Sequence, residues 1–183
     1  EIAKTKYKDI DNYLYDLKMN VIVNNFNDIN LKRIHQLINK TNQFNLTTKR
    51  YTLKEIQEFT NSSNHKTLSF NLSDTFGEYG LVGIALIENN NNSKWIIKNL
   101  LMSCRVIGRK FEHFMMDTIV NLAHSNHIEK IYGEYIKTKY NGLVFEYFNS
   151  VGFIERETAH NIKKYELNVA EYKYNAGELF NRQ

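Results

Sequence analysis

Apolar residues follow two different spacings along this chain of 183 residues, and the two spacings alternate in a regular order. A spacing of two follows one face of a strand, whereas a spacing of three or four follows one face of a helix. From both patterns we predict the element order β-α-α-β-β-β-α-β-α-β-β. This order indicates a single α+β domain with a mixed central sheet flanked by helices.

The first part of the chain predicts one strand and two helices. The apolar run at 21–23 is β-branched and indicates a strand. Apolar positions 31, 34, 37 and 38 have helical spacing, and Asn27 or Asn30 can cap that helix. A second, short helix begins at a capping box, in which Thr52 and Glu55 can satisfy each other's backbone N–H groups.

The second part predicts a strand meander followed by alternating helices and strands. The meander has strands at 68–72, 81–87 and 95–103, and its last loop holds the asparagine run 89–92. The elements expected after it are a helix at 111–125, a strand at 129–135, a helix at 141–150 with Val144, Phe145 and Phe148 inward, and strands at 153–154 and 162–169.

The opening segment differs from the rest because it is polar and has only a weak helical rhythm, at Ile10, Leu14 and Leu17. We therefore expect residues 1–19 to be a linker helix from an upstream domain. Residues 20–183 form the main predicted domain.

Composition narrows the class of protein. A hydrophobic content of 42% with 24% charged residues is typical of a globular domain. The net charge of +4 has no dense Lys/Arg tract behind it, so solvated lysines explain it and we expect no nucleic-acid partner. No apolar run reaches membrane-spanning length, and we expect no membrane partner. A single cysteine cannot form an internal disulfide, which favours a cytoplasmic location.

The segment from Leu100 to Lys110 holds the most informative chemistry. It is typical of a strand that ends in a short basic loop and turns directly into a helix. Such a turn leaves backbone N–H groups free at a helix N-terminus, where they favour an anion such as a phosphate. The candidate anion-binding residues are Ser103, Arg105, Val106, Gly108, Arg109 and Lys110.

The order of elements and this loop resemble the GCN5-related N-acyltransferase (GNAT) fold. The loop of that family has the pattern Arg/Gln-x-x-Gly-x-Gly/Ala, and Arg105 and Gly108 match its first and fourth positions. Lys110 departs from the small residue expected at the last position. The resemblance implies that one strand splays from its neighbour and that the loop grips the pyrophosphate of coenzyme A.

A narrower resemblance covers almost the whole chain. Residues 39–51, 74–83 and 102–109 are similar to the C-terminal domain of FkbH-like proteins. That family joins a haloacid-dehalogenase (HAD)-type phosphatase domain to a GNAT-like domain and loads a glyceryl group onto an acyl carrier protein. The resemblance implies an upstream HAD-like phosphatase domain in the same chain, an acyl carrier protein as partner, and its phosphopantetheine arm or coenzyme A as cofactor.

Cys104 is open to two interpretations. A thiol beside Arg105, Arg109 and a helix N-terminus is favoured as a thiolate and can accept an acyl group as a thioester. A lone cysteine at a strand end is also often a small, buried apolar side chain. In the first interpretation Cys104 is the catalytic nucleophile.

Each of the other candidate site residues also has a purely structural interpretation. Short polar side chains can bind a hydroxylated acyl group, so Asn42, Gln43, Asn45 and Thr47 are candidate substrate-binding residues, although such residues also build turns. Tyr147 lies where the resemblance places a general acid, yet its apolar neighbours suit a core position. Asp74 can be a base or a solvated loop acid. No histidine is assigned to catalysis, and we expect no metal.

Three functions fit the sequence. The first is an acyltransferase domain that handles a glyceryl-type acyl group for a carrier-protein thiol. The second is a conventional acetyl-coenzyme A-dependent N-acetyltransferase, and the third is a non-catalytic module that docks the carrier protein.

Overall fold

An eight-stranded mixed sheet forms the centre of the computed structural model, which describes residues 10–90 and 93–182. Its strands are β1 (Met19–Asn24), β2 (His65–Asp74), β3 (Gly77–Asn90), β4 (Lys94–Met102), β5 (Lys130–Ile136), β6 (Ile154–Ala159), β7 (Ile162–Asn168) and β8 (Phe180–Arg182). They lie in the order β6-β7-β5-β4-β3-β2-β1-β8. The pairs β4–β5 and β1–β8 are parallel, and the other neighbours are antiparallel.

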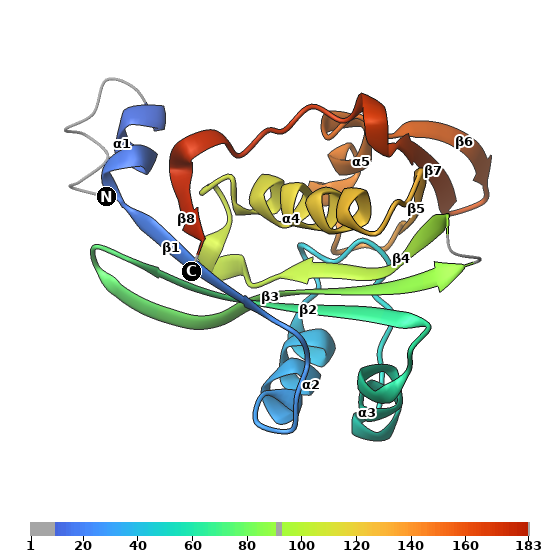
Figure 1. Cartoon of the computed structure of the whole chain (residues 1–183), viewed down its shortest axis with the longest axis horizontal. Helices are drawn as coiled ribbons and strands as arrows, with labels where there is room; N and C mark the ends of the chain where they lie inside the picture. Colours follow the sequence, from blue (N-terminus) through green and yellow to red (C-terminus); the bar gives the residue numbers. More distant parts are fainter. Residues whose placement is uncertain (1–9, 91–92, 183) are drawn as a thin grey trace.

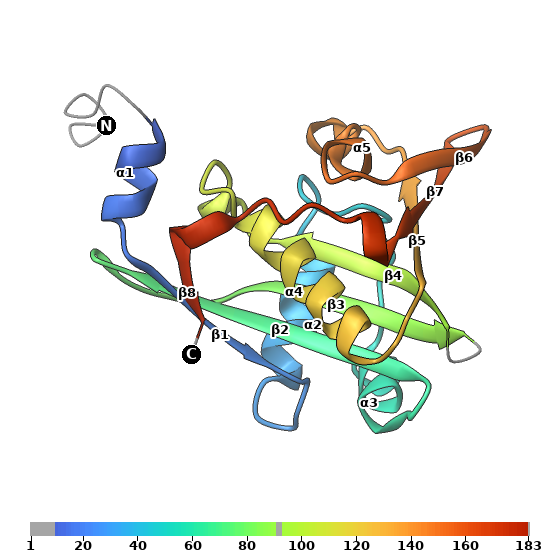
Figure 2. The same ribbon diagram turned by 45° about the horizontal axis from the view of Figure 1, so that its top comes forward.

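The helices cover both faces of this sheet. They are α1 (Ile10–Asp16), α2 (Leu31–Lys40), α3 (Leu53–Asn61), α4 (Phe111–Ser125) and α5 (Tyr147–Ser150). Helices α2 and α3 lie on one face, and α4 lies on the other (Figure 1). The C-terminal segment passes over α4 (Figure 2), where the buried carboxylate of Asp117 accepts hydrogen bonds from Tyr172 Oη at 2.6 Å and Ala176 N at 2.8 Å.

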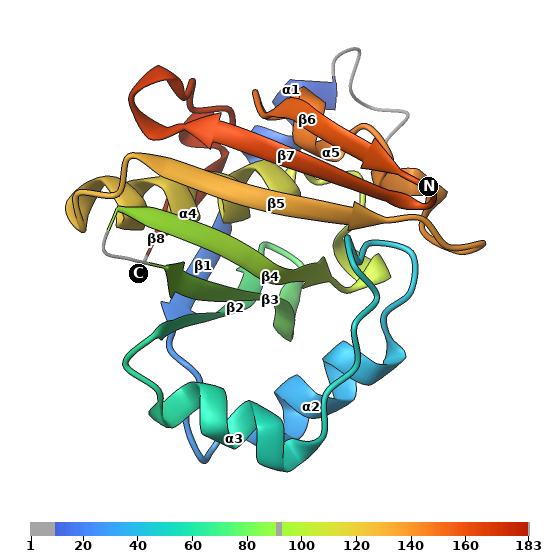
Figure 3. The same ribbon diagram turned by 90° about the vertical axis from the view of Figure 1, so that its right-hand side faces the viewer.

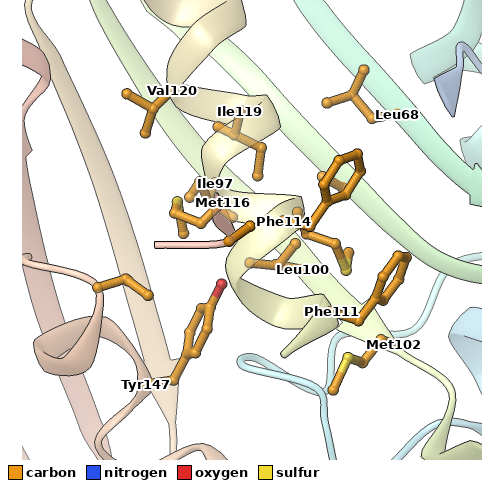
Figure 4. Packing of buried hydrophobic residues seen from close by; sticks show 14 of the residues in the cluster. Leu68, Ile97, Leu100, Met102, Phe111, Phe114, Met116, Ile119, Val120 and Tyr147 are labelled. Atoms are coloured by element: carbon orange, nitrogen blue, oxygen red, sulfur yellow. The ribbon is translucent and has the colours of Figure 1, made fainter. Parts of the chain in front are cut away.

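The helices on the two faces of the sheet form two apolar clusters, one on each face. On one face α4 contributes Phe111, Phe114, Met116 and Ile119, which pack against the sheet (Figure 4). On the other face a smaller cluster gathers side chains of α2 and α3, among them Ile34 and Ile56, against β3 and β4. A side chain buried in either cluster is stabilised by roughly 1.5–3 kcal/mol relative to its exposed state.

The predicted helix starts are confirmed. At α3, Thr52 Oγ1 accepts from Glu55 N at 3.2 Å and Glu55 Oε2 accepts from Thr52 N at 2.7 Å, so the capping box is complete. Before α2, the side chain of Asn27 accepts from the backbone N–H groups of Ile29 and Asn30 at 3.0 and 3.1 Å. Asn30 holds the N-cap position of α2 without a side-chain cap bond, and the bonds of Asn27 close the turn before the helix, so neither asparagine side chain caps α2 itself.

The predicted order of strands and helices is confirmed, with three differences. The helix expected at 141–150 is split into a 3₁₀ turn at Gly142–Val144 and the short α5. Phe145, expected inside, is 38% exposed because it lies between the two pieces. Strand β8 was not predicted, since three residues carry no periodicity of their own.

The opening segment packs onto the domain. Helix α1 covers Ile10–Asp16, and both Leu14 and Leu17 are buried in the larger apolar cluster. Ile10 is exposed, and strand β1 already begins at Met19. Residues 1–9 of the expected linker helix lie outside the described residues, as do residues 91 and 92 of the asparagine run.

Strands β4 and β5 diverge, and another part of the chain fills the space between them. Their pairing runs only from Lys94–Lys130 to Ile97–Gly133. Beyond that point, Leu46 N donates to Leu100 O at 3.3 Å, and Ile136 N donates to Leu46 O at 2.9 Å. The segment that joins α2 to α3 thus reaches the carboxyl ends of β4 and β5 (Figure 3).

Candidate functional site

The loop between β4 and α4 has the geometry of an anion cradle. After the 3₁₀ turn at Cys104–Val106, Gly108 has φ +83° and Lys110 has φ +59°, both in the left-handed region. Within the described part of the chain, the backbone N–H groups of Gly108, Arg109 and Lys110 donate no hydrogen bond. Successive free N–H groups beside a helix N-terminus form a concavity that favours negative charge.

The side chains of this loop point in different directions. Val106 is fully buried in the core, so only its backbone is available to a ligand. Ser103 Oγ accepts from Arg105 N at 3.4 Å and from Arg105 Nε at 3.2 Å, which holds the 3₁₀ turn. Lys110 Nζ bonds Asp11 Oδ1 of α1 at 2.6 Å, so its side chain extends away from the cradle.

Arg109 lies in a closed cluster with Asp74 and Tyr79. Its guanidinium pairs with the Asp74 carboxylate, whose side chain is completely buried, and donates to Tyr79 Oη at 2.7 Å. The guanidinium carbon also lies 4.6 Å from the centre of the Tyr79 ring. Asp74 is therefore not a solvated loop acid, because this pair joins the β2–β3 turn to the loop.

Cys104 is exposed and faces a cleft of about 680 Å³ on the α2 side of the sheet. This α2-side cleft is lined by Arg33, Gln36, Leu37, Lys40, Thr41, Asn42, Gln43, Phe44, Ser103, Cys104, Arg105, Lys139 and Tyr140. Four of these residues are cationic and none is acidic. The alternative of a buried Cys104 is thereby wrong.

The four polar residues expected to bind substrate divide into two pairs. Asn42 and Gln43 line the α2-side cleft together with Cys104. Asn45 and Thr47 are buried, and they bond the loop itself: Asn45 Oδ1 accepts from Thr48 N at 2.9 Å, and Thr47 Oγ1 lies 3.4 Å from Lys98 O. Asn45 and Thr47 therefore make the bonds of turn-building residues, which is the structural alternative stated for them.

A second cavity of about 200 Å³ lies on the other side of Phe44. Its lining includes Met102, Glu112, His113 and Tyr147, and Phe44 lines both this cavity and the α2-side cleft. The Phe44 and Tyr147 rings meet edge to face, with their centres 5.3 Å apart. The two predicted catalytic residues therefore line different cavities, since Phe44 separates Tyr147 from the cleft that holds Cys104.

Tyr147 is buried against α4 (Figure 4). Its hydroxyl donates to the backbone carbonyl of Glu112 at 2.8 Å. Burial raises the pKa of Tyr147 well above its ordinary value, and the nearby Tyr172, Glu112 and Asp117 raise this pKa further. The phenol thus holds its proton throughout the physiological range.

Several residues that shape the site were not identified as candidates from the sequence. Arg33 and Lys40 reach the cleft from α2, and Lys139 reaches it from the segment after β5. The spacing of Arg33, Gln36 and Lys40 along one helix face is a signal that sequence reasoning could have used. The fully buried Asn141 also shapes the site. Its Nδ2 donates to Asn45 O and Ile136 O at 3.0 Å each.

Two further features of the described residues bear on the class of protein. Within residues 10–90 and 93–182, no helix combines the length and the apolar character that a membrane span requires. The same residues contain no group of three or more His, Cys, Asp or Glu side chains placed to hold a metal ion.

Known proteins match this chain only through structure. No family model matches the sequence, and no curated protein matches it. The spermidine N-acetyltransferase of Vibrio cholerae, solved with CoA and spermine, has 12% identity and a TM-score of 0.61 over 82% of this chain and 96% of that chain. The ribosomal-protein-S18-alanine N-acetyltransferase of Escherichia coli has 9% identity and a TM-score of 0.62 over 81% and 94%.

A third similar structure is the GNAT domain of S. lividans PAT, which has 12% identity and a TM-score of 0.62 over 80% of this chain and 89% of that chain. The chain therefore has the GNAT fold, which confirms the predicted fold class. At identities this low, structural similarity shows a shared fold only. The activity has to be argued from the residues of the site.

Proposed function

We propose that this chain is an acyltransferase domain that passes a glyceryl-type acyl group to the phosphopantetheine thiol of an acyl carrier protein, with Cys104 carrying the group between two steps. The supporting observation is the exposed Cys104 thiol in a 680 Å³ cleft whose lining includes the amides of Asn42 and Gln43. A cleft of this size suits a small ligand, and amides suit its hydroxyl groups. The proposed partners are the carrier protein and an upstream HAD-like phosphatase domain.

The proposed chemistry consists of two acyl exchanges without oxidation or reduction. The Cys104 thiol loses its proton to solvent, and its sulfur attacks the carbonyl carbon of an activated donor, an acyl phosphate or a thioester. A C–S bond forms as the phosphate or the donor thiolate leaves. The carrier thiol then loses its proton to solvent, and its thiolate attacks this carbonyl. A new C–S bond forms to the carrier, the bond to Cys104 breaks, and the Cys104 thiolate takes a proton back from solvent. Arg105 and Lys139 line the same cleft and favour these anions.

Coenzyme A, which the fold implies, fits the site only in part. The free N–H groups of Gly108, Arg109 and Lys110 suit its diphosphate. However, residues 44–46 occupy the space between the diverging β4 and β5, and Met102 N donates to Phe44 O at 3.1 Å there. An extended arm cannot lie along that edge of β4 while this segment is in place.

The anion cradle and Tyr147 favour a second candidate function, a conventional acetyl-coenzyme A-dependent N-acetyltransferase. Tyr147 lines the second cavity and keeps its proton, which it donates to Glu112 O at 2.8 Å; to protonate a departing thiolate it would have to give up that bond. Calorimetry with acetyl-coenzyme A separates the two candidates. Micromolar binding together with acetylation of an amine supports this second function, whereas absence of binding supports use of a carrier protein.

The first function is tested by mixing the protein with an acyl donor and a carrier protein that bears phosphopantetheine, then measuring the mass of the carrier. We expect acylated carrier with the wild type and with the control Ser62→Ala, a substitution far from the cleft in sequence and absent from its lining. We expect none with Cys104→Ala. Transfer by Cys104→Ala at the wild-type rate would rule out the nucleophile. Carrier binding without any transfer would indicate a docking module.

A further inference from the structure

The side chain of Asn42 is held in one orientation by Arg50. The Arg50 guanidinium donates to Asn42 Oδ1 through Nη2 and to the backbone carbonyl of Ile38 through Nη1. Ile38 lies in the last turn of α2, where carbonyl groups lack partners within the helix. Arg50 therefore joins the end of α2 to the Asn42 amide, and it does so from outside the lining of the α2-side cleft.

This bond determines which polar atom Asn42 offers to the cleft. A guanidinium has only donors, so the amide presents its oxygen to Arg50 and turns its Nδ2 to the opposite side. Within the described part of the chain, Asn42 Nδ2 donates no hydrogen bond. Because Asn42 lines the cleft and Arg50 does not, this free N–H donor is the group that Asn42 has left for a bound ligand.

Asn42 and Cys104 follow the end of the same short ladder. The segments that carry them are joined in antiparallel fashion, and the last bond between them runs from Met102 N to Phe44 O at 3.1 Å. Asn42 lies two positions before Phe44, and Cys104 lies two positions after Met102. In an antiparallel register these are opposed positions, and both residues line the α2-side cleft.

We propose that Asn42 Nδ2 donates a hydrogen bond to the acyl carbonyl oxygen during acyl exchange at Cys104, and that Arg50 is the positioning residue that holds this donor. The inference rests on the proposed function and adds a catalytic residue to it. When the Cys104 sulfur attacks the carbonyl carbon, the C=O double bond becomes a single bond and its oxygen gains a negative charge. The double bond forms again as the leaving group departs. A donor that is fixed beforehand stabilises this charge without reorganisation.

The neighbouring Gln43 shows why the orientation matters. It lines the same cleft and is exposed, and no hydrogen bond of its side chain fixes the amide among the described residues. Gln43 can therefore turn either its oxygen or its nitrogen to a ligand, which suits a hydroxyl group because a hydroxyl both donates and accepts. Asn42 has lost this choice, and a fixed donor suits an oxygen that only accepts.

Two reagents that modify the Cys104 thiol separate this role from a general effect on the thiol. p-Nitrophenyl acetate acylates a thiolate through a tetrahedral oxyanion, whereas iodoacetamide alkylates it by direct displacement and forms no such oxyanion. Both rates depend on the fraction of thiolate, so the ratio of the two rates is independent of that fraction. Cys104 is the only cysteine, so intact mass reports each modification, and Cys104→Ala measures the background at other side chains.

The test variants are Asn42→Ala, Arg50→Met, Arg50→Lys and the double variant Asn42→Ala/Arg50→Met. We expect Asn42→Ala to lower the ratio of acylation to alkylation at least about tenfold. Arg50→Met should lower it about threefold, and Arg50→Lys less, because an ammonium still donates to the Asn42 oxygen. The double variant should match Asn42→Ala, because Arg50 acts through Asn42. The controls Asn61→Ala and Lys32→Met, both exposed and outside the cleft lining, should keep the wild-type ratio.

Three results would overturn the inference. They are an unchanged ratio in Asn42→Ala, a double variant whose loss is the product of the two single losses, and a wild type that iodoacetamide alkylates but p-nitrophenyl acetate does not acylate. The assay needs neither a glyceryl donor nor a carrier protein. A lowered ratio without acylation of the carrier would therefore reject the proposed function alone, and acylation of the carrier with an unchanged ratio would reject this inference alone.

Discussion

Two arginines of one loop lie in opposite environments. Arg109 pairs with the fully buried carboxylate of Asp74 and contacts Tyr79, and its own side chain is only 17% exposed. Arg105, four positions earlier, is exposed and lines the α2-side cleft with three other unpaired cations. The closed cluster therefore fixes the shape of the loop, while the open cleft keeps its charge available for a ligand.

The comparison teaches that residue type alone does not indicate role. A cation that neutralises a buried carboxylate is structural, because removing it leaves an uncompensated charge in the interior. An exposed cation without a partner contributes little to folding, because water already solvates it. Both arginines were predicted to bind an anion, and the contacts of Arg109 suit a positioning role instead.

The largest expected effect is the loss of the Arg109 pair. We expect Arg109→Met to lower the free energy of unfolding by about 3 kcal/mol, because Asp74 stays buried without its partner. Urea denaturation measures this loss. The double variant Arg109→Met/Asp74→Asn should recover part of it, since the buried charge is then gone. A loss below about 1 kcal/mol in the single variant would contradict the structural role.

The next effect concerns Asn141, which ties the segment between α2 and α3 to the end of β5. Its amide donates to Asn45 O and Ile136 O, and its Oδ1 accepts from Thr138 N at 2.8 Å. We expect Asn141→Ala to cost about 2 kcal/mol and to speed hydrogen exchange at the Leu46 and Ile136 amides. Unchanged exchange at both amides would mean that residues 44–47 are held without Asn141.

Arg105→Ala separates folding from binding. We expect the free energy of unfolding to change by less than about 0.5 kcal/mol, because the side chain is exposed and makes one neutral side-chain contact, to Ser103. Acyl transfer should nevertheless fall about tenfold. The two assays are urea denaturation and the carrier acylation rate. A loss of stability comparable to that of Arg109→Met would remove the contrast between the two regions.

The smallest expected effect concerns Lys110, which has left-handed φ and an exposed pair with Asp11. Lys110→Gly relieves the backbone strain of the left-handed conformation but loses the pair, so we expect a net change below about 0.5 kcal/mol. Lys110→Ala keeps the strain and should be the less stable of the two in urea denaturation. The reverse order would contradict the strained backbone.

Local patterns predicted the fold well, because periodicity and caps are read from neighbouring residues. The Thr52–Glu55 box and the stripe of α4 are of this kind. The site depends on contacts between distant residues. Asp74 meets Arg109 across 35 positions, Asn141 reaches Asn45 across 96, and the four cleft cations come from three separate segments. The position of residues 44–46 between β4 and β5 was not predicted either, because the surrounding segment 41–48 is mostly polar and typical of a turn.

The most direct test of the account is the intact mass of the protein after incubation with an acyl donor. We expect the wild type to gain the mass of one acyl group, to lose it on treatment with hydroxylamine, and to pass it to a carrier-protein thiol. Cys104→Ala should gain no mass, whereas Arg109→Met, at a temperature where it is folded, should still be acylated. An acyl adduct on Cys104→Ala, or none on the wild type while acylated carrier is formed, would contradict the role of Cys104.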